Sequence, residues 1–216
     1  MLDAVHLEQA IAAFVTFFVV IDAVGVAPVF ATLTSSGGAA YARAMAVKSA
    51  FVAGVILFLF AFLGPWLLKH LGISLDSFRA AGGALLFLIA LDMVFEKRQE
   101  RRKHRADEVM AHDHPAPEDI SVFPLGIPMI AGPGSIATAM LFMQNAGGDP
   151  WSVGVVVAAI GANLVLTALI FMAATPLLKL LGESVAGATT RIFGVILAAL
   201  AVQFIVDGLR GAFGAG

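Results

Sequence analysis

Six long apolar runs, separated by short polar gaps, constrain the fold of this chain more than any other feature. They cover residues 10–33, 49–68, a third stretch that starts near 73 or 78 and ends at 95, and then 121–144, 153–178 and 187–206. About 20 helical residues cross a hydrocarbon core of about 30 Å. Only 13% of the residues are charged, whereas a soluble domain has about 25%. The sequence predicts an all-α membrane protein with six transmembrane helices.

The one long polar segment lies between the third and fourth runs. It opens with a basic stretch at residues 97–105 and continues as acidic, proline-containing sequence to residue 120. Because it has no apolar period to bury, we expect a flexible linker. The predicted organisation is therefore residues 1–96 with three spans, the linker 97–120, and residues 121–216 with three more spans.

Basic residues predict the orientation of the chain in its membrane. Placing the linker in the cytoplasm puts 10 of the 13 Lys and Arg residues on that side, as the positive-inside rule requires. Both termini then face the periplasm or cell exterior. The first residues lack the Lys and Arg of a cleaved signal peptide, so we expect the first run to be retained. The basic stretch also suits contact with anionic lipids.

The two halves of the sequence resemble each other. A Leu-Leu-Lys-x-Leu-Gly pattern occurs at residues 67–72 and 177–182, and Arg-x-x-Gly follows at 79–82 and 191–194. Repeats of three spans each must enter the membrane from opposite sides, which predicts two inverted three-helix repeats, a plan common in secondary transporters. The alternative is that Leu, Ala and Gly match by chance in any two apolar stretches.

Helix breakers occur at equivalent positions of the first and fourth runs. Asp22 lies near the middle of the first run, where an Asp costs roughly 2.5–3.5 kcal/mol, and Gly25 and Pro28 follow it. In the fourth run, two prolines precede the Gly-Pro-Gly segment at 132–134. Non-helical backbone at this depth is tolerated only where it is buried in protein or lines a cavity. We expect spans 1 and 4 to be broken near mid-membrane.

We expect a substrate to bind between the broken helices of spans 1 and 4, which provide groups suited to a zwitterion. A helix that resumes after a break presents unsatisfied N–H groups and a positive dipole end to a carboxylate. The preceding helix end and Asp22 suit an ammonium group, or Na⁺ or H⁺ as a coupling ion. Small side chains around the breaks favour a small amino acid. The candidate substrate-binding residues are Asp22, Gly25, Pro28, Thr32, Gly132, Pro133, Gly134, Ser135, Thr138 and Asn163. The alternative is that Pro and Gly mark only kinks and tight packing, and that Asn163 makes a packing hydrogen bond.

Intramembrane catalysis has little support in the sequence. A serine protease would need a His within a span to activate Ser135, and every His lies near an end or in a loop. An aspartyl protease needs two carboxylates at one depth, but Asp92 and Asp207 lie near the ends of their runs. We expect no enzyme activity.

Metal, cofactor and nucleic-acid sites are not expected either. The chain has no Cys, and the pair His112 and His114 falls in the predicted linker without a clear third ligand. A net charge of −2 gives no basic field for nucleic acid. Membrane lipids and a small neutral amino acid are the expected partners, and a homo-oligomer is compatible with the sequence.

Four segments together resemble the MarC family of bacterial inner-membrane proteins: residues 21–28, 73–83, 124–135 and 191–205. One departure is Ala23, where the family commonly has Pro after the Asp, so the first break is expected to be milder or to begin later. The resemblance implies six spans and a location in the bacterial inner membrane. Its SnatA-like members imply transport of small neutral amino acids such as glycine and alanine. The alternatives are a non-transporting or lipid-interacting protein and an exporter of another small metabolite.

Overall fold

The computed structural model describes residues 2–110 and 119–214 and is helical throughout, with no strand in those two ranges. The elements in chain order are α1 (Leu2–Ile21), α2 (Ala23–Leu33), α3 (Gly38–His70), α4 (Leu75–Val94), α5 (Lys97–Met110), the π-helix η1 (Ser121–Ile130), α6 (Pro133–Asn145), α7 (Pro150–Met172) and α8 (Ala174–Ala212).

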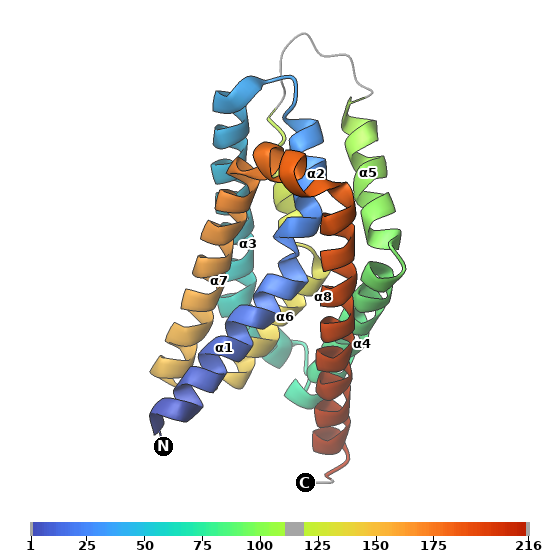
Figure 1. The fold of residues 1–216 in the computed structure, drawn as a ribbon. Coiled ribbons are helices and arrows are strands. Elements are labelled where there is room, and N and C mark those ends of the chain that lie inside the picture. The colour runs from blue at the N-terminus through green and yellow to red at the C-terminus, as the bar shows by residue number, and fades with distance from the viewer. Residues whose placement is uncertain (1, 111–118, 215–216) are drawn as a thin grey trace.

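The expected membrane-spanning character is confirmed at the level of length and composition. Within the described residues, five helical segments are long and apolar enough to cross a membrane, and η1 with α6 makes a sixth if this bent pair is one span. The successive passes alternate in direction, so both termini lie at one end of the bundle and α5 lies at the other (Figure 1).

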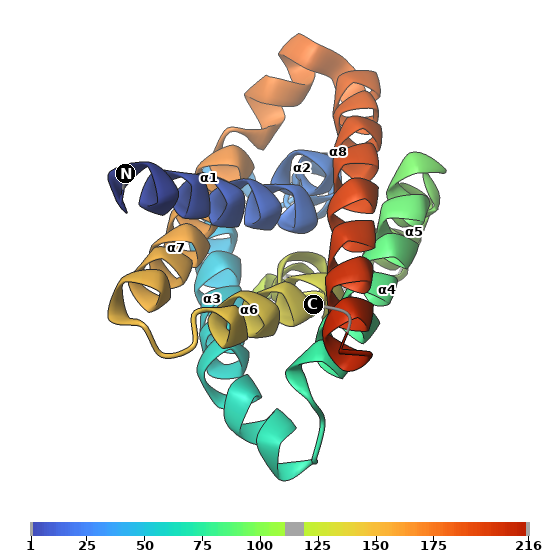
Figure 2. The same cartoon turned by 90° about the horizontal axis from the view of Figure 1, so that it is seen from below.

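The interrupted helices occupy the centre of the bundle. Seen along its axis, α1, α2 and α6 lie between α3 and α7 on one side and α4 and α8 on the other (Figure 2). In the most apolar stretch of Leu7–Leu33, 61% of the residues are buried inside the protein. In the corresponding stretch of Ser184–Ala212 the buried share is only 22%. Apolar side chains such as Phe51 and Ile192 are exposed on the outer helices, as a lipid-facing surface requires. The first span is thus shielded from lipid by its neighbours.

Close packing on each side fixes the walls of this centre. The rings of Phe30 and Phe171 stack with centroids 4.5 Å apart and join α2 to α7. A Cβ at Gly83 would lie 2.8 Å from the Ala201 carbonyl oxygen and the Ile205 amide nitrogen, so this glycine permits the close approach of α4 to α8. Gly182 has φ 76°, and the bend there separates the first turns of α8 from its membrane-spanning part.

The segment after α4 differs from the flexible linker that the sequence predicts. Residues Lys97–Met110 form helix α5, and its Arg102 is only 3% exposed. The helix forms because one face packs against the bundle through α2 and α4. This correction concerns residues 97–110, since 111–118, including His112 and His114, lie outside the described residues. The division into 1–96, 97–120 and 121–216 is otherwise still a prediction.

Candidate functional site

The first interruption is centred on Asp22. Helix α1 ends at Ile21 and α2 begins at Ala23, with Asp22 between them at φ 55° and ψ 52°. Asp enters this left-handed region more readily than most residues. Its carboxylate caps α2 by accepting a hydrogen bond from the Gly25 amide at 3.2 Å. One residue therefore both breaks the helix and caps the segment that follows.

The Asp22 carboxylate is fully buried and is paired with a cation from α5. Arg102 donates from Nη1 to Asp22 Oδ2 at 2.8 Å. The Thr190 hydroxyl on α8 donates to Asp22 Oδ1 at 3.1 Å. Because an isolated buried charge carries a large desolvation cost, this pairing is what allows Asp22 to remain at the centre of the bundle.

Helix α5 also binds the backbone at the same interruption. Arg98 Nη2 donates to the Val20 carbonyl at 2.9 Å, in the last turn of α1, where helix carbonyls lack an intrahelical partner. Burial and the neighbouring Arg102 cation lower the pKa of Arg98 to about 9, so the group remains protonated at neutral pH. Two arginines of one helix thus satisfy the carboxylate and a carbonyl of the break.

The second interruption lies between η1 and α6, which meet at an angle of 60°. Phe123 and Ile127 leave the helical region inside η1, because each precedes a proline that disfavours helical backbone; both of these bonds to proline are cis. Helix α6 then starts with Pro133 after the extended Gly132, and no side chain caps it. Its first amide groups are left for another partner.

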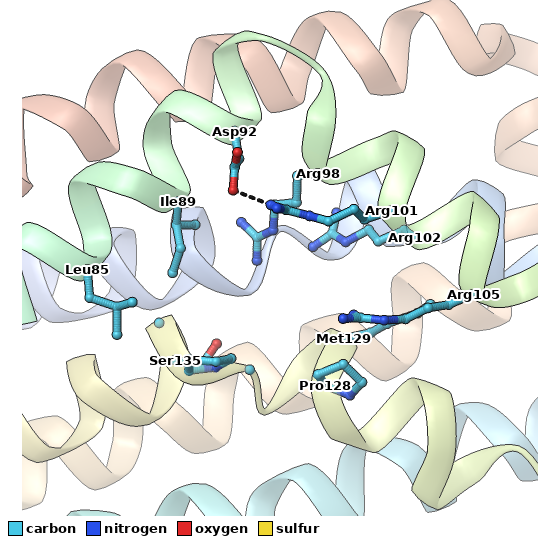
Figure 3. A pocket seen from close by; sticks show the side chains of 13 residues that line it. Leu85, Ile89, Asp92, Arg98, Arg101, Arg102, Arg105, Pro128, Met129 and Ser135 are labelled. Atoms are coloured by element: carbon cyan, nitrogen blue, oxygen red, sulfur yellow. Dashed lines mark hydrogen bonds and ion pairs between the residues drawn. The ribbon is translucent and has the colours of Figure 1, made fainter.

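A cavity of about 290 Å³ opens at this second interruption. One wall is α4 and the arginine-bearing face of α5, and the other is the η1–α6 junction (Figure 3). The lining residues are Leu85, Ile89, Asp92, Arg98, Arg101, Arg102, Arg105, Pro128, Met129, Gly132, Pro133, Gly134 and Ser135. The volume is at the lower limit of the roughly 300–1,000 Å³ usual for small-molecule sites, which favours a small ligand.

The cavity carries an excess of positive charge. Arg101 forms an ion pair with Asp92 along the wall made by α4 and α5 (Figure 3). Arg102 uses Nη1 on Asp22, while its buried Nη2 has no hydrogen-bond partner among the described residues. Arg105 likewise has no hydrogen bond or ion pair within the described part of the chain. The arrangement is chemically suited to an anionic group.

Comparison with known proteins identifies the family. The model for the MarC family of integral membrane proteins matches residues 7–213. The chain belongs to the MarC family. It is 41% identical over 208 residues to a UPF0056 membrane protein of Methanocaldococcus jannaschii, covering 95% of this chain and 98% of the relative. It is 36% identical over 200 residues to the UPF0056 membrane protein YvbG of Bacillus subtilis, covering 93% of each chain.

A third MarC relative, the UPF0056 membrane protein YhcE of Escherichia coli, is 33% identical over 204 residues, covering 93% of this chain and 91% of the relative. No solved structure matches the chain. These names describe membrane proteins and specify no cargo. Together with the spans, they show that the chain is a multi-pass integral membrane protein of the MarC family.

The predicted site residues of this MarC chain fall into two groups. Four of them line the cavity: Gly132, Pro133, Gly134 and Ser135. Thr138 lies one turn deeper and is fully buried, with a hydroxyl that has no partner among the described residues. The Ser135 hydroxyl donates to the Ile130 carbonyl at 2.8 Å. The second break therefore presents its first α6 residues to the cavity.

The residues of the other group lie outside this cavity, and their part in substrate binding is still a prediction. Asp22 reaches the cavity only through Arg102. Gly25 packs against Asp22 and Thr190. Pro28 lines a separate pocket of about 430 Å³ beside α5, and Thr32 donates to the Pro28 carbonyl.

Asn163 makes packing hydrogen bonds inside the bundle. Its Nδ2 donates to the Phe14 carbonyl at 3.1 Å and to the Ala159 carbonyl at 2.9 Å. Asn163 thereby joins α7 to α1, and it is not among the residues that line the cavity.

Sequence reasoning missed the four arginines that α5 contributes. Their positions provide a signal, because Arg98, Arg101, Arg102 and Arg105 follow the spacing i, i+3, i+4 and i+7. That spacing places side chains on one face of a helix. The arginine pattern therefore predicts a helix with one cationic face, whereas the absence of an apolar period alone suggests a flexible linker.

Proposed function

We propose that this MarC-family protein is a secondary transporter of small neutral amino acids such as glycine and alanine, acting in the bacterial inner membrane. The observation that carries the proposal is the cavity of about 290 Å³ at the η1–α6 break. A close-packed bundle with purely structural kinks would leave no such space at a helix break. The cavity lies beside the central, interrupted helices, where a transporter binds its substrate.

The cavity offers partners for both ends of an amino acid. The uncapped amino end of α6 suits the carboxylate. Asp92 is an acidic residue of the lining and now forms an ion pair with Arg101. It suits the substrate ammonium if that ammonium replaces Arg101 as its partner. Apolar contacts from Leu85 and Ile89 leave room for a short side chain. These features favour a small zwitterion.

The proposal includes two inverted repeats with a broken helix in each, near mid-membrane. The three passes of residues 1–96 start at the end of the bundle that holds both termini, and the three passes of 121–216 start at the α5 end (Figure 1). With α5 on the cytoplasmic side and the termini outside, the positive-inside bias is satisfied. Asp22 is the proposed coupling residue, with Na⁺ or H⁺ acting on its pair with Arg102.

Flux into vesicles tests the proposed function. The purified protein is reconstituted into liposomes, and entry of radiolabelled glycine and alanine is compared with that into protein-free liposomes and into liposomes with the D22N variant. We expect saturable entry with the wild type and slower entry with D22N, because the variant alters the proposed coupling residue. Equal flux with and without the protein across a panel of small amino acids would remove the proposal.

A lipid-interacting role is the second candidate, and one surface feature favours it. A pocket of about 660 Å³ between α2, α3, α7 and α8 has Arg43 and Lys179 beside Phe30 and Phe171. Cations next to apolar groups suit an anionic phospholipid. Stabilisation of the protein by anionic lipid, combined with no amino acid flux, would favour this role over transport.

A further inference from the structure

We infer that helix α5 completes a carboxylate-binding site in the η1–α6 cavity, with Arg102 and Arg105 as donors. This assigns a recognition role to a segment outside the transmembrane spans. The identity of the ligand as an amino acid rests on the proposed function, whereas the carboxylate class follows from the cavity itself.

Arg102 is the first support for an anionic ligand. Its side chain is almost fully buried and lines the cavity, yet it uses only Nη1 on Asp22. Its Nη2 is buried without a hydrogen-bond partner in the described residues. Buried donors of a charged group are normally satisfied, so an acceptor in the cavity is the missing partner.

The opposite wall supports the same ligand independently. The N-terminal end of α6 has no side-chain cap, and its Gly134 and Ser135 line the cavity. Helix N-termini attract anions through free amide groups and the helix dipole. The arginines of α5 on one wall therefore face the η1–α6 junction on the other (Figure 3).

The balance of charge selects an anion over a cation. Four arginines line the cavity against one described acidic residue, Asp92, which already pairs with Arg101. Arg105 adds a guanidinium with no partner in the described part of the chain. Guanidinium groups bind carboxylates through paired, charge-assisted hydrogen bonds. The pocket chemistry thus matches a small carboxylate.

Arg102 also connects the two helix breaks. One guanidinium nitrogen binds Asp22 at the first break, and the same side chain lines the cavity at the second. A carboxylate bound to Nη2 competes with Asp22 for the same cation. Ligand binding is thereby linked to the Asp22–Arg102 pair.

Thermal stabilisation of the full-length protein in detergent tests this site, since ligands that bind the folded state raise its melting temperature. Alanine, propionate and alaninamide are compared at equal pH and equal ionic strength. We expect alanine and propionate to raise the melting temperature and alaninamide, which lacks a carboxylate, to leave it unchanged.

Two variants test the arginines. R102Q alone would leave Asp22 buried without its cation, so the neutral double variant D22N/R102Q replaces both partners at once. R105Q leaves the Asp22 pair intact. We expect the double variant to lose stabilisation by propionate and R105Q to need several-fold more propionate. R210Q, on an exposed arginine in the last turn of α8 outside the cavity, is the matched control and is expected to behave as wild type.

Stabilisation by alaninamide equal to that by alanine would overturn the inference. So would undiminished stabilisation by propionate in R105Q, a result that holds even if the double variant does not fold. If alanine and propionate stabilise the protein and alaninamide does not, but no amino acid flux is seen, only the proposed transport is removed. If flux is seen but the three ligands do not differ in thermal stabilisation, only the carboxylate site at α5 is removed.

Discussion

At the scale of single residues, Asp22 has a demanding environment for a charged group. It is fully buried, left-handed in backbone conformation, and bound by Arg102, Thr190 and the Gly25 amide. Each contact removes part of the cost of holding a carboxylate away from water. The stability of the first helix break therefore depends on partners contributed by α5 and α8.

Removing one member of the buried ion pair is expected to destabilise the protein strongly. D22A leaves the Arg102 cation without its partner, and breaking such a pair costs about 3–5 kcal/mol. Replacing both partners in D22N/R102Q is expected to cost less than D22A, because no charge is left alone. Unfolding in detergent with increasing SDS measures both. Wild-type stability of D22A would mean that the two side chains are not paired.

Gly25 is expected to tolerate no side chain. A Cβ at this position would collide with Thr190 Oγ1 and with the Asp22 carboxylate. G25A should therefore lower the melting temperature by several degrees, whereas G161A, whose Cβ meets nothing within 4 Å, should be neutral. Thermal melts of the two variants provide the comparison, and equal melting temperatures would contradict the packing around Asp22.

Ionisation of Asp119 is expected to make the stability of the fold depend slightly on pH in the acid range. Hydrogen bonds from Lys48 and Ser121 lower the pKa of Asp119 to about 2. The folded pKa is below the unfolded value of about 3.9, so the carboxylate stabilises the fold above about pH 4 and loses that contribution as the pH falls toward 2. Because the side chain is half exposed, screening keeps the effect small.

The D119N variant tests this reasoning. Its melting temperature should lie slightly below that of the wild type at pH 7, and the two should converge near pH 2. A gap that grows as the pH falls would show that the ionised Asp119 does not stabilise the fold.

At the scale of elements, the sequence predicted the second break better than it predicted α5. Prolines and glycines act on their own backbone, so the residues 132–134 locate the end of η1 and the start of α6 without tertiary information. The role of α5 depends on long-range contacts. Its Arg102 meets Asp22, 80 positions earlier in the chain, and no local property of residues 97–110 reveals that partner.

Hydrogen exchange distinguishes a docked α5 from a flexible linker. Peptides that cover Lys97–Met110 should exchange slowly, because helical hydrogen bonds and packing against α2 protect their amides. Mass spectrometry of the detergent-solubilised protein measures this. Complete exchange of these peptides within seconds would contradict the docked helix, and the end of α4 serves as the protected reference.

At the scale of the whole molecule, the fold connects the helix interruption at Asp22 with the one between η1 and α6 through α5. Neighbouring helices shield the first of these, in Leu7–Leu33, from lipid. Arg98 and Arg102 bind the first break, while the same face of α5 lines the cavity at the second. The lengths of the apolar helices and the alternating direction of the passes were predictable, since they follow from the order and length of the apolar runs in the sequence. The site assembled between distant segments was not, because it depends on how those segments pack.

Alanine flux into liposomes, measured with the cavity filled by a larger side chain, is the most direct test of the substrate site. Leu85 on α4 lines the cavity, whereas Leu88 on the same helix is 60% exposed and lies outside the cavity lining. L85W places an indole in the substrate space while every arginine of the lining is kept, and L88W is the matched control. We predict that L85W abolishes saturable alanine flux and that L88W retains it. Wild-type flux through L85W would contradict the assignment of this cavity as the substrate site.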